Sequence, residues 1–454
     1  IWTPVSRARH VDTFRKGFTV RTMTSAEQIS VTTDEAENDA STSSVLGGCC
    51  RSDGLAPTLP AYKIGTQPPT VAAGRVGLRR AALAAAACAC VAVGFGLAWV
   101  VPGRRSTPGE RGAATNAGGG LYAAAARASE DQLSFMVVGD WGRRGAFNQT
   151  AVARAMGACG AVSRPDFVVS VGDNFYEGGL NSLDDPEFAQ SFTDVYAHPS
   201  LQVPWHAVLG NHDYGDCGYD DAKGEVACPL AADAARSPRF QLDPSLRRRD
   251  WRWRAGRSFD LRPSTDAHLF FVDTTPLVTS YADKTWFASV PEGAATQNAA
   301  VGAHKMGEAL NASDAKWKLV FGHHPMRSNG FWSDVQDVRD ALELTAVRGG
   351  ATAYFNGHDH DMQHTSVDVE LEPKRGVGSS STQRLHHFTS GAGSKTGRGF
   401  GVVETLFEHD GAGFASVRVS RGSVRVQFWG VGAGEGLLYT VSIDKPPSSA
   451  SLSG

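Results

Sequence analysis

Short apolar runs alternate with polar turns through the middle of the chain. The runs at 134–138, 166–171 and 205–209 each end in a polar turn, and helical patterns follow the first two at 147–159 and about 187–197. This rhythm of strand, turn and helix predicts parallel βαβ units. In open α/β sheets, ligands bind outside the carboxyl ends of the strands, so the turns are the first place to look for chemistry.

The pattern breaks at 215–262 and then resumes. We interpret 215–262 as an insertion over the surface, because it is polar and contains the run Arg247-Arg248-Arg249. Further strands are predicted at 268–272, 317–321 and 351–355, with a helix at 334–347. The runs at 385–390, 399–406, 414–419, 423–429 and 437–442 complete the strands. We therefore expect an α/β (α+β) fold over 131–446, with two sheets packed face to face and helices outside.

The first 130 residues have a different character. Residues 1–80 show no sustained apolar periodicity and predict a disordered tail, as does 447–454. Residues 81–101 carry no charge and are long enough to span a bilayer. We favour a transmembrane signal-anchor helix followed by a linker at 102–130, which would leave the C-terminal domain lumenal or extracellular. A buried helix, or a cleaved signal that releases a secreted protein, is the alternative.

Composition narrows the class of protein. With 41% hydrophobic and 20% charged residues the chain can build a sizeable core, and its net charge of −3 argues against a nucleic-acid partner. None of the 7 cysteines forms a CxxC pair, which excludes a zinc finger. In an oxidising compartment Cys217 and Cys228 could form a disulfide or remain free thiols. In the same compartment Asn148 and Asn311, each the first residue of an Asn-x-Ser/Thr triplet, are acceptors for N-glycosylation. We expect a monomer.

Five of the polar turns carry groups that bind metal ions. They are Gly139-Asp140-Trp141-Gly142, Gly172-Asp173-Asn174-Phe175-Tyr176, Gly210-Asn211-His212-Asp213, Gly322-His323-His324-Pro325 and Gly357-His358-Asp359-His360. The candidate ligands among them are Asp140, Asp173, Tyr176, Asn211, His323, His358 and His360. These seven candidate ligands, together with bound waters, are more than one metal ion can coordinate. We therefore interpret the motifs as a site for two ions. A two-metal site suits in-line displacement at phosphorus.

The five motifs GDWG, GDNFY, GNHD, GHHP and GHDH resemble those of the calcineurin-like metallophosphoesterases, specifically the small, mammalian-type, tartrate-resistant purple acid phosphatases. The resemblance covers about residues 133–445. It implies a four-layer β-sandwich with flanking helices, and an acid phosphatase that hydrolyses phosphate monoesters by attack of metal-bound hydroxide. Phosphorylated small molecules or phosphoproteins would be the substrates. The implied cofactors are a ferric iron and a second divalent metal, namely iron, zinc or manganese.

The resemblance also divides the ligands between the two ions. Asp140, Asp173, Tyr176 and His360 would bind the ferric ion, and Asp173, Asn211, His323 and His358 the divalent one, with Asp173 as the bridge. Most metallophosphoesterases have Asp-x-His in the first motif, whereas this chain has Asp140-Trp141-Gly142. Tyr176 would replace that missing histidine. A nearby trivalent cation is expected to ionise its phenol.

Four residues, His212, Asp213, Asn211 and His324, are candidates for a role in catalysis or substrate binding. His212 would protonate the leaving alkoxide or hydrogen-bond the phosphate, although a supporting role beside the ligands is the alternative. Asp213 would orient His212. Asn211 and His212 are expected to bind substrate, and His324 either does so or fills space. A phosphodiesterase or nucleotide pyrophosphatase, an iron-binding redox protein and a non-catalytic ectodomain remain as rival functions.

Overall fold

The computed structural model describes residues 122, 132–220, 225–226, 236–372, 380–432 and 436–445. The predicted tail at 1–80, the predicted anchor at 81–101 and most of the predicted linker lie outside these ranges. Among the described residues, no helix has the length and apolar character that a membrane crossing requires.

The first sheet is mixed and follows the order β16-β15-β14-β1-β2-β3-β6. Its parallel half consists of β1 (Leu133–Val138), β2 (Phe167–Ser170), β3 (Trp205–Ala207) and β6 (Trp253–Ala255). Its antiparallel half consists of β14 (Gly413–Val419), β15 (Ser423–Gly430) and β16 (Gly436–Asp444). The early and late parts of the domain therefore meet along β1, which pairs with β14.

The second sheet is also mixed and has the order β13-β11-β12-β10-β9-β8-β7. Four neighbouring strands are parallel: β8 (Ala267–Phe271), β9 (Trp317–Phe321), β10 (Ala353–Asn356) and β12 (Ser381–Ser390). The antiparallel strands are β7 (Phe259–Leu261), β11 (Met362–Leu371) and β13 (Phe407–His409). Two short strands, β4 (Tyr219–Asp220) and β5 (Glu225–Val226), form a separate ribbon.

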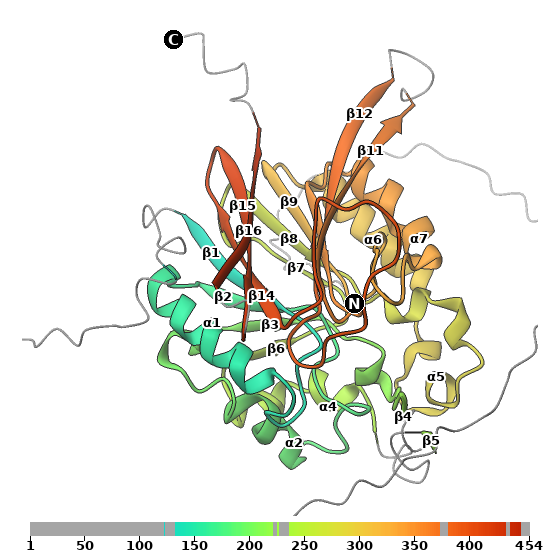
Figure 1. Ribbon diagram of the computed structural model, residues 1–454. Coiled ribbons are helices and arrows are strands. Elements are labelled where there is room, and N and C mark those ends of the chain that lie inside the picture. Colours follow the sequence, from blue (N-terminus) through green and yellow to red (C-terminus); the bar gives the residue numbers. More distant parts are fainter. Residues whose placement is uncertain are drawn as a thin grey trace, which may run out of the picture. The chain divides into compact units, whose positions relative to one another are not determined.

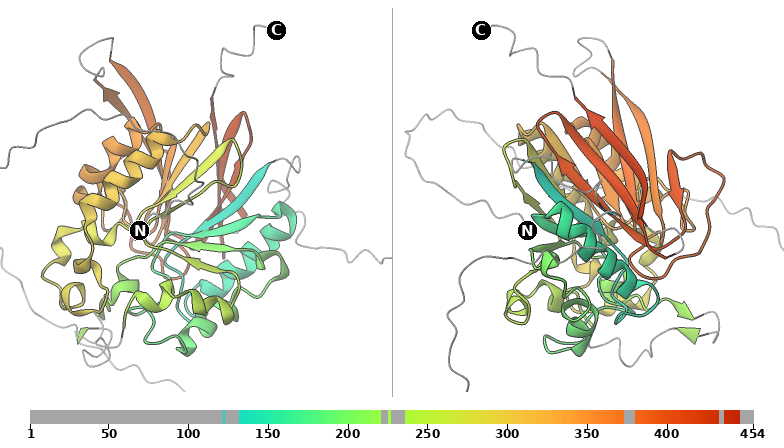
Figure 2. Two further views of the ribbon diagram at one scale, coloured as in Figure 1. Left: turned by 180° about the vertical axis from the view of Figure 1, so that it is seen from behind. Right: turned by 60° about the vertical axis from the view of Figure 1, so that its left-hand side comes forward.

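Side chains on the two faces of β1 pack into two different cores, which defines the layers. Phe135 and Val137 lie in a core with Leu319 and Phe321 of the facing sheet. Met136 and its neighbours on the other face pack against α1 (Gln149–Ser163). The outer face of the second sheet is covered by α6 (Ala299–Ala312) and α7 (Gln336–Arg348). The result is a sandwich of helix, sheet, sheet and helix (Figures 1 and 2).

Short helices occupy the connections between these elements. The α-helical ones are α2 (Pro186–Phe188), α4 (Arg239–Leu242) and α5 (Thr285–Ser289). Single turns of other helix types are η2 (Ala189–Thr193), η3 (Pro199–Leu201), η4 (His212–Tyr214), η5 (Pro244–Arg248), η6 (Thr275–Leu277), η7 (Thr279–Tyr281) and η8 (Ala294–Thr296).

The prediction that 215–262 is a surface insertion is wrong for its second half. β6 and β7 are edge strands of the two sheets, and Trp253 is buried among aromatic rings that include Trp141, with ring centroids 6.4 Å apart. Arg252 is also buried, with its guanidinium paired to Asp250 at 2.6 Å. An edge strand pairs on one side only and can be three residues long, so its apolar pattern is too short to stand out.

A second difference concerns the predicted strand at 399–406, which is irregular in the structure. Val402 and Val403 are exposed there, so the apolar residues of this run face solvent and not a core. Conversely, α6 and β11 had no counterpart among the predicted elements. β11 carries polar residues at most positions, including Gln363, His364 and Asp368, which hides its strand character.

Cys217 is disulfide-bonded, which was one of the two alternatives considered for it, the other being a free thiol. Its expected partner, Cys228, lies outside the described residues. Asn148 and Asn311 are both exposed, so either could accept a glycan, and glycosylation stays a prediction.

Candidate metal centre

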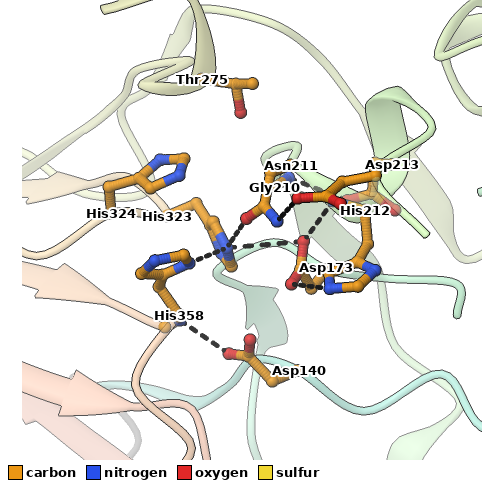
Figure 3. Close-up of polar contacts among 12 residues, drawn as sticks. Asp140, Asp173, Gly210, Asn211, His212, Asp213, Thr275, His323, His324 and His358 are labelled. Carbon is orange, nitrogen blue, oxygen red and sulfur yellow. Dashed lines mark hydrogen bonds and ion pairs between the residues drawn. The ribbon is translucent and has the colours of Figure 1, made fainter. Parts of the chain in front are cut away.

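The five motif turns meet at one edge of the sandwich, each directly after a parallel strand. Asp140 follows β1, Asp173 follows β2 and Asn211 follows β3, while His323 follows β9 of the second sheet. His358 and His360 follow β10. Figure 3 shows that the side chains of Asp140, Asp173, Asn211, His323 and His358, contributed by both sheets, point toward a common centre, and His360 lies within 3.4 Å of Asp140. The seven candidate ligands therefore converge as the sequence predicted, although they span more than 200 residues of chain.

One group of donors surrounds the phenol of Tyr176. Its hydroxyl oxygen lies 3.1 Å from Asp140 Oδ1, 2.9 Å from Asp173 Oδ2 and 3.2 Å from His360 Nε2. His360 Nε2 is also 3.4 Å from Asp140 Oδ1. All four side chains are buried. Three oxygens and one nitrogen thus face a single point.

A second group of donors surrounds His323. Its Nε2 atom lies 3.2 Å from Asn211 Oδ1, 3.3 Å from His358 Nδ1 and 3.4 Å from Asp173 Oδ1. The other ring nitrogen, Nδ1, faces the carbonyl oxygen of Val171 at 2.9 Å. A hydrogen bond from Nδ1 to that carbonyl fixes the orientation of the ring and directs Nε2 at the centre, as second partners of metal-bound histidines do.

Asp173 belongs to both groups. Its Oδ2 atom faces Tyr176, and its Oδ1 atom faces His323 and accepts a hydrogen bond of 3.0 Å from the backbone N–H of His212. This placement of two oxygens toward two donor groups is what a bridging carboxylate requires. His358 and His360 divide in the same way, since each faces a different group.

The backbone of the site is held in an unusual conformation at three donors. Asp140 has φ of 61°, Asp173 of 50° and His358 of 69°, all in the left-handed region. Non-glycine residues adopt this region in only a few per cent of cases, at a cost on the order of 1–3 kcal/mol each. Such outliers cluster at functional sites, where the surrounding structure holds them.

The missing histidine of the first motif has a steric explanation. A Cβ atom at Gly142 would lie 1.8 Å from the carbonyl oxygen of Asn174, so no side chain fits at that position. The backbone N–H of Tyr176 donates a 2.8 Å hydrogen bond to the Gly142 carbonyl oxygen. The close approach that excludes a histidine at 142 therefore also positions Tyr176 beside Asp140.

Burial and mutual proximity shift the pKa values of the candidate ligands. Burial raises the pKa of Asp140 to about 8. Burial, together with the charges of Asp140 and Asp173, raises the pKa of Tyr176 well above its ordinary value. Burial opposes the charged form of His323, but the charges of Asp173 and Asp140, with hydrogen bonds to Asp173 and the Val171 carbonyl, together outweigh it and raise the pKa to about 9. Burial lowers the pKa of His358 and of His360. Without ions, the carboxyl of Asp140, the phenol and the imidazole of His323 therefore all retain protons near neutral pH.

This donor set fits a pair of metal ions. Carboxylates, a phenol, an amide oxygen and imidazoles converge, and the facing ring nitrogens of His323 and His358 lie 3.3 Å apart. Groups of Asp140, Asp173 and His323, and of His323, His324 and His358, lie close enough to hold an ion. The lone pairs of these oxygen and nitrogen atoms repel one another, and only protons or cations between them relieve that repulsion. Oxygen donors together with imidazoles are ligands of first-row transition metals in proteins.

His212 lies at the margin of this centre. Its Nε2 atom is 3.9 Å from Asp173 Oδ2, its Nδ1 atom is 3.6 Å from Glu177 Oε2, and its ring packs against Tyr176 with centroids 4.4 Å apart. The His212 side chain is partly exposed, whereas the neighbouring Asp173 and Tyr176 side chains are buried. This position gives it access both to the centre and to solvent.

The predicted role of Asp213 is wrong. Its carboxylate does not contact His212 but accepts hydrogen bonds from the backbone N–H groups of Asn174, Phe175 and Gly210 and from the Gln241 side chain, at 2.8–3.3 Å. Burial, with the charge of Asp173, raises its pKa to about 7. The carboxylate ties together the turns after β2 and β3. Consecutive residues in a 3₁₀ turn point in different directions, which is why adjacency in sequence misled the prediction.

His324 is fully buried, and both of its ring nitrogens face protein hydroxyls. Nδ1 lies 2.9 Å from Thr274 Oγ1, and Nε2 lies 3.0 Å from Tyr281 Oη. Its ring packs 4.5 Å from that of His358. Of the two roles considered for it, these contacts favour packing that supports His358 over direct contact with substrate.

Two residues beside the centre escaped the sequence analysis. The guanidinium of Arg143 lies over the Tyr176 ring, 3.5 Å from its centroid, and forms an ion pair with Glu177. The charge of Arg143 opposes the factors that raise the Tyr176 pKa. Glu177 follows Tyr176 directly, so proximity to a candidate ligand was the available signal.

Comparison with known proteins agrees with this geometry. A family profile described as calcineurin-like phosphoesterase matches residues 133–362. The chain is 39% identical to Purple acid phosphatase 3 of Arabidopsis thaliana over 315 residues, which cover 67% of this chain and 76% of that protein. It is 38% identical to Purple acid phosphatase 4 of the same plant, over 66% and 81% of the two chains. Tartrate-resistant acid phosphatase type 5 of Oryctolagus cuniculus is 30% identical, over 54% and 70%. The chain therefore belongs to the calcineurin-like phosphoesterase family, among the purple acid phosphatases.

Proposed function

We propose that the protein is a bimetallic acid phosphatase that hydrolyses phosphate monoesters. The observation that carries the proposal is the pair of donor groups that share Asp173, one around Tyr176 and one around His323. Asp140, Asp173, Tyr176 and His360 are proposed to hold a ferric ion. Asp173, Asn211, His323 and His358 are proposed to hold a divalent iron, zinc or manganese ion. When bound, such a pair lowers the pKa of water and offsets the negative charge of a phosphate.

The chain's own contribution to the chemistry comes from groups around the ions. Asp173 and Tyr176 are held by the backbone of neighbouring turns, since Asp173 Oδ1 accepts from the His212 N–H and the Tyr176 N–H donates to the Gly142 carbonyl oxygen. His212 lies at the open side, where it can donate a proton to the departing alkoxide oxygen. Glu177, 3.6 Å from His212 Nδ1, is placed to orient that imidazole and to stabilise its charged form. Asn211 and His212 are the proposed substrate contacts, with His324 behind them.

The role of His212 predicts a dependence on the leaving group. Alkyl phosphates release a basic alkoxide that needs a proton, whereas p-nitrophenolate leaves without one. Replacing His212 with Ala should lower kcat for an alkyl phosphate by about 10²–10⁴-fold and have a much smaller effect on p-nitrophenyl phosphate. His304→Ala is a matched control, because His304 is highly exposed on α6 and away from the five turns.

The metal assignment is tested in the same preparation by metal analysis and by visible absorption. Iron content with a visible band that is lost on Tyr176→Phe is the expected result. A colourless, iron-free protein would refute the ferric assignment. A coloured protein that turns over neither monoesters nor bis(p-nitrophenyl) phosphate would favour the iron-binding rival, and a preference for the diester would favour the phosphodiesterase.

The proposed location follows from the sequence and from one structural feature. The disulfide at Cys217 suits an oxidising compartment, as expected of a lumenal or extracellular domain. Membrane attachment through 81–101 remains a proposal. It is tested by carbonate extraction of membranes from cells that express the full chain, in which an anchored protein stays with the lipid.

A further inference from the structure

Two large aromatic side chains are exposed at the rim of the metal centre. Phe331 is 58% exposed and Trp332 is 49% exposed, and their rings meet nearly at right angles with centroids 4.9 Å apart. Trp332 also lies 5.8 Å from the ring of the proposed ligand His358. A molecule that contacts Trp332 therefore lies beside a proposed metal ligand.

The loop that presents these rings is rigidly attached to the turn that carries the histidines. The backbone N–H of Trp332 donates a 2.7 Å hydrogen bond to Asp359 Oδ1, and the hydroxyl of Ser328 donates to the other oxygen of Asp359. A Cβ atom at Gly330 would lie 2.5 Å from Asp359 Cγ, so this approach depends on glycine. The rings are thus held at a fixed position relative to His358 and His360.

A cation lies over the same pair of rings. The guanidinium of Arg398 is 5.5 Å from the Phe331 centroid and 5.3 Å from the Trp332 centroid. Its own backbone N–H donates a 3.1 Å hydrogen bond to Asp410, which also accepts from the N–H groups of Gly397 and Gly399. Two separate segments, 328–333 and 397–403, therefore build this corner, and each is anchored by a carboxylate.

We propose that Phe331, Trp332 and Arg398 form a subsite for a planar aromatic ring carried by the phosphate ester. This inference rests on the proposed phosphatase function, because the position of the phosphate is set by the metal centre. We take the free energy of stacking between an exposed protein ring and a ligand ring to be similar to that of an aromatic pair inside a protein. That free energy corresponds to roughly a 2- to 10-fold gain in affinity. Arg398 favours an anionic ester over a neutral one.

A planar ring could belong to a small aryl group or to a nucleobase, and two matched pairs of probes separate these. Benzylphosphonate and butylphosphonate are not hydrolysed, so their inhibition constants report binding alone and test the aryl group. Adenosine 5′-monophosphate and ribose 5-phosphate release the same kind of primary alcohol, so the ratio of their kcat/KM values tests the base. Both ratios are measured with the metal-loaded full chain and with Trp332→Leu.

We expect the wild-type protein to prefer the aromatic member of at least one pair by about 2- to 10-fold, and Trp332→Leu to abolish that preference. Trp251→Leu is the matched control and should leave the ratios unchanged. Trp251 is 52% exposed and precedes β6, whereas the five turns follow the ends of their strands. A preference in the first pair alone assigns an aryl group, and in the second pair alone a nucleobase.

Two results would overturn the proposal and are distinguishable from failure of the phosphatase assignment. If the protein hydrolyses ribose 5-phosphate but prefers neither aromatic probe, or keeps its preference in Trp332→Leu, the subsite does not exist while the phosphatase stands. If it hydrolyses no monoester and binds no phosphonate, the proposed function itself fails.

Discussion

The proton on Tyr176 gives a quantitative test of its role as a ligand. In the ligand-free site the phenol donates to Asp140 Oδ1 or Asp173 Oδ2, at 3.1 and 2.9 Å, and burial and both carboxylates raise its pKa well above 10. Even an ordinary phenol with a pKa of about 10 costs about 7 kcal/mol to ionise at pH 5. Burial adds to this cost, so a bound ion must supply more than that amount. A trivalent ion meets this requirement more readily than a divalent one.

The measurable consequence is proton release on metal loading. At pH 7 the ligand-free site holds protons on Tyr176, on Asp140 with a pKa of about 8 and on His323 with a pKa of about 9. Loading should therefore displace about three protons, of which Asp140 and His323 together contribute roughly two. The Tyr176→Phe variant should release about one proton fewer.

The assay loads ligand-free protein with gallium(III) citrate and then zinc, and counts protons in a weakly buffered solution that contains a pH indicator. Gallium is trivalent and redox-inert, and protons from its own hydration water are common to all variants. Tyr196→Phe is the control, since Tyr196 is a buried phenol of the aromatic core that contacts no candidate ligand. Equal release from Tyr176→Phe and from the wild-type protein would show that the phenol keeps its proton, and Tyr176 would then not be a ligand.

Three further outcomes follow from the structure. Asp213→Asn should lower the free energy of unfolding by at least about 2 kcal/mol in urea titrations, because an amide nitrogen would then face backbone N–H groups. A loss below about 0.5 kcal/mol would contradict the role of the Asp213 carboxylate as a hydrogen-bond acceptor. Trp253→Ala should lower the free energy of unfolding by about 3–5 kcal/mol, and Trp251→Ala should lower it by less than about 0.5 kcal/mol. Similar losses in the two variants would support the interpretation of 215–262 as a surface insertion. Burial, with nearby arginine charges, lowers the pKa of His206 from 6.5 to about 4, so the unfolded chain takes up a proton first as the pH falls. Stability should therefore be full above pH 6.5 and decline by about 2 kcal/mol between pH 7 and 5 through this residue, and His206→Phe should remove that decline in thermal unfolding followed across pH.

The strands and the ligand-bearing turns were readable from the sequence because both depend on local patterns. The strand at 317–321 agrees with β9, and 134–138, 414–419 and 423–429 differ from β1, β14 and β15 by one residue at an end. Buried strands are recognisable in the sequence as apolar runs, because both of their faces pack against a core. Elements with one exposed face or with few residues, such as β6, β7 and β11, lack that signal. The exposed run at 399–406 shows the converse error, because apolar residues there face solvent.

Roles that depend on side-chain direction could not be read from the sequence. Asp213 follows His212, yet its carboxylate points into the interior and binds three backbone N–H groups. Arg143 and Glu177 come from different turns and meet over the Tyr176 ring. Neighbours in sequence predict contact only where the local conformation is known, and a short 3₁₀ turn such as η4 spreads consecutive side chains in different directions.

The sequence by itself determined which groups are available for chemistry and in which order their strands occur, because motifs and apolar periodicity are local properties of the chain. The family resemblance implied that His358 and His360 serve different ions and that Asp173 bridges them, and the tertiary structure shows these side chains facing two donor groups in that arrangement. Only the tertiary structure decided that Gly142 leaves no room for the histidine that Tyr176 replaces. It also brought Trp332 and Arg398, which are distant in the chain, to the rim of the same centre. The physical reason is that parallel strands bring the ends of remote segments to one edge of the sandwich, and packing of the two sheets then fixes their directions.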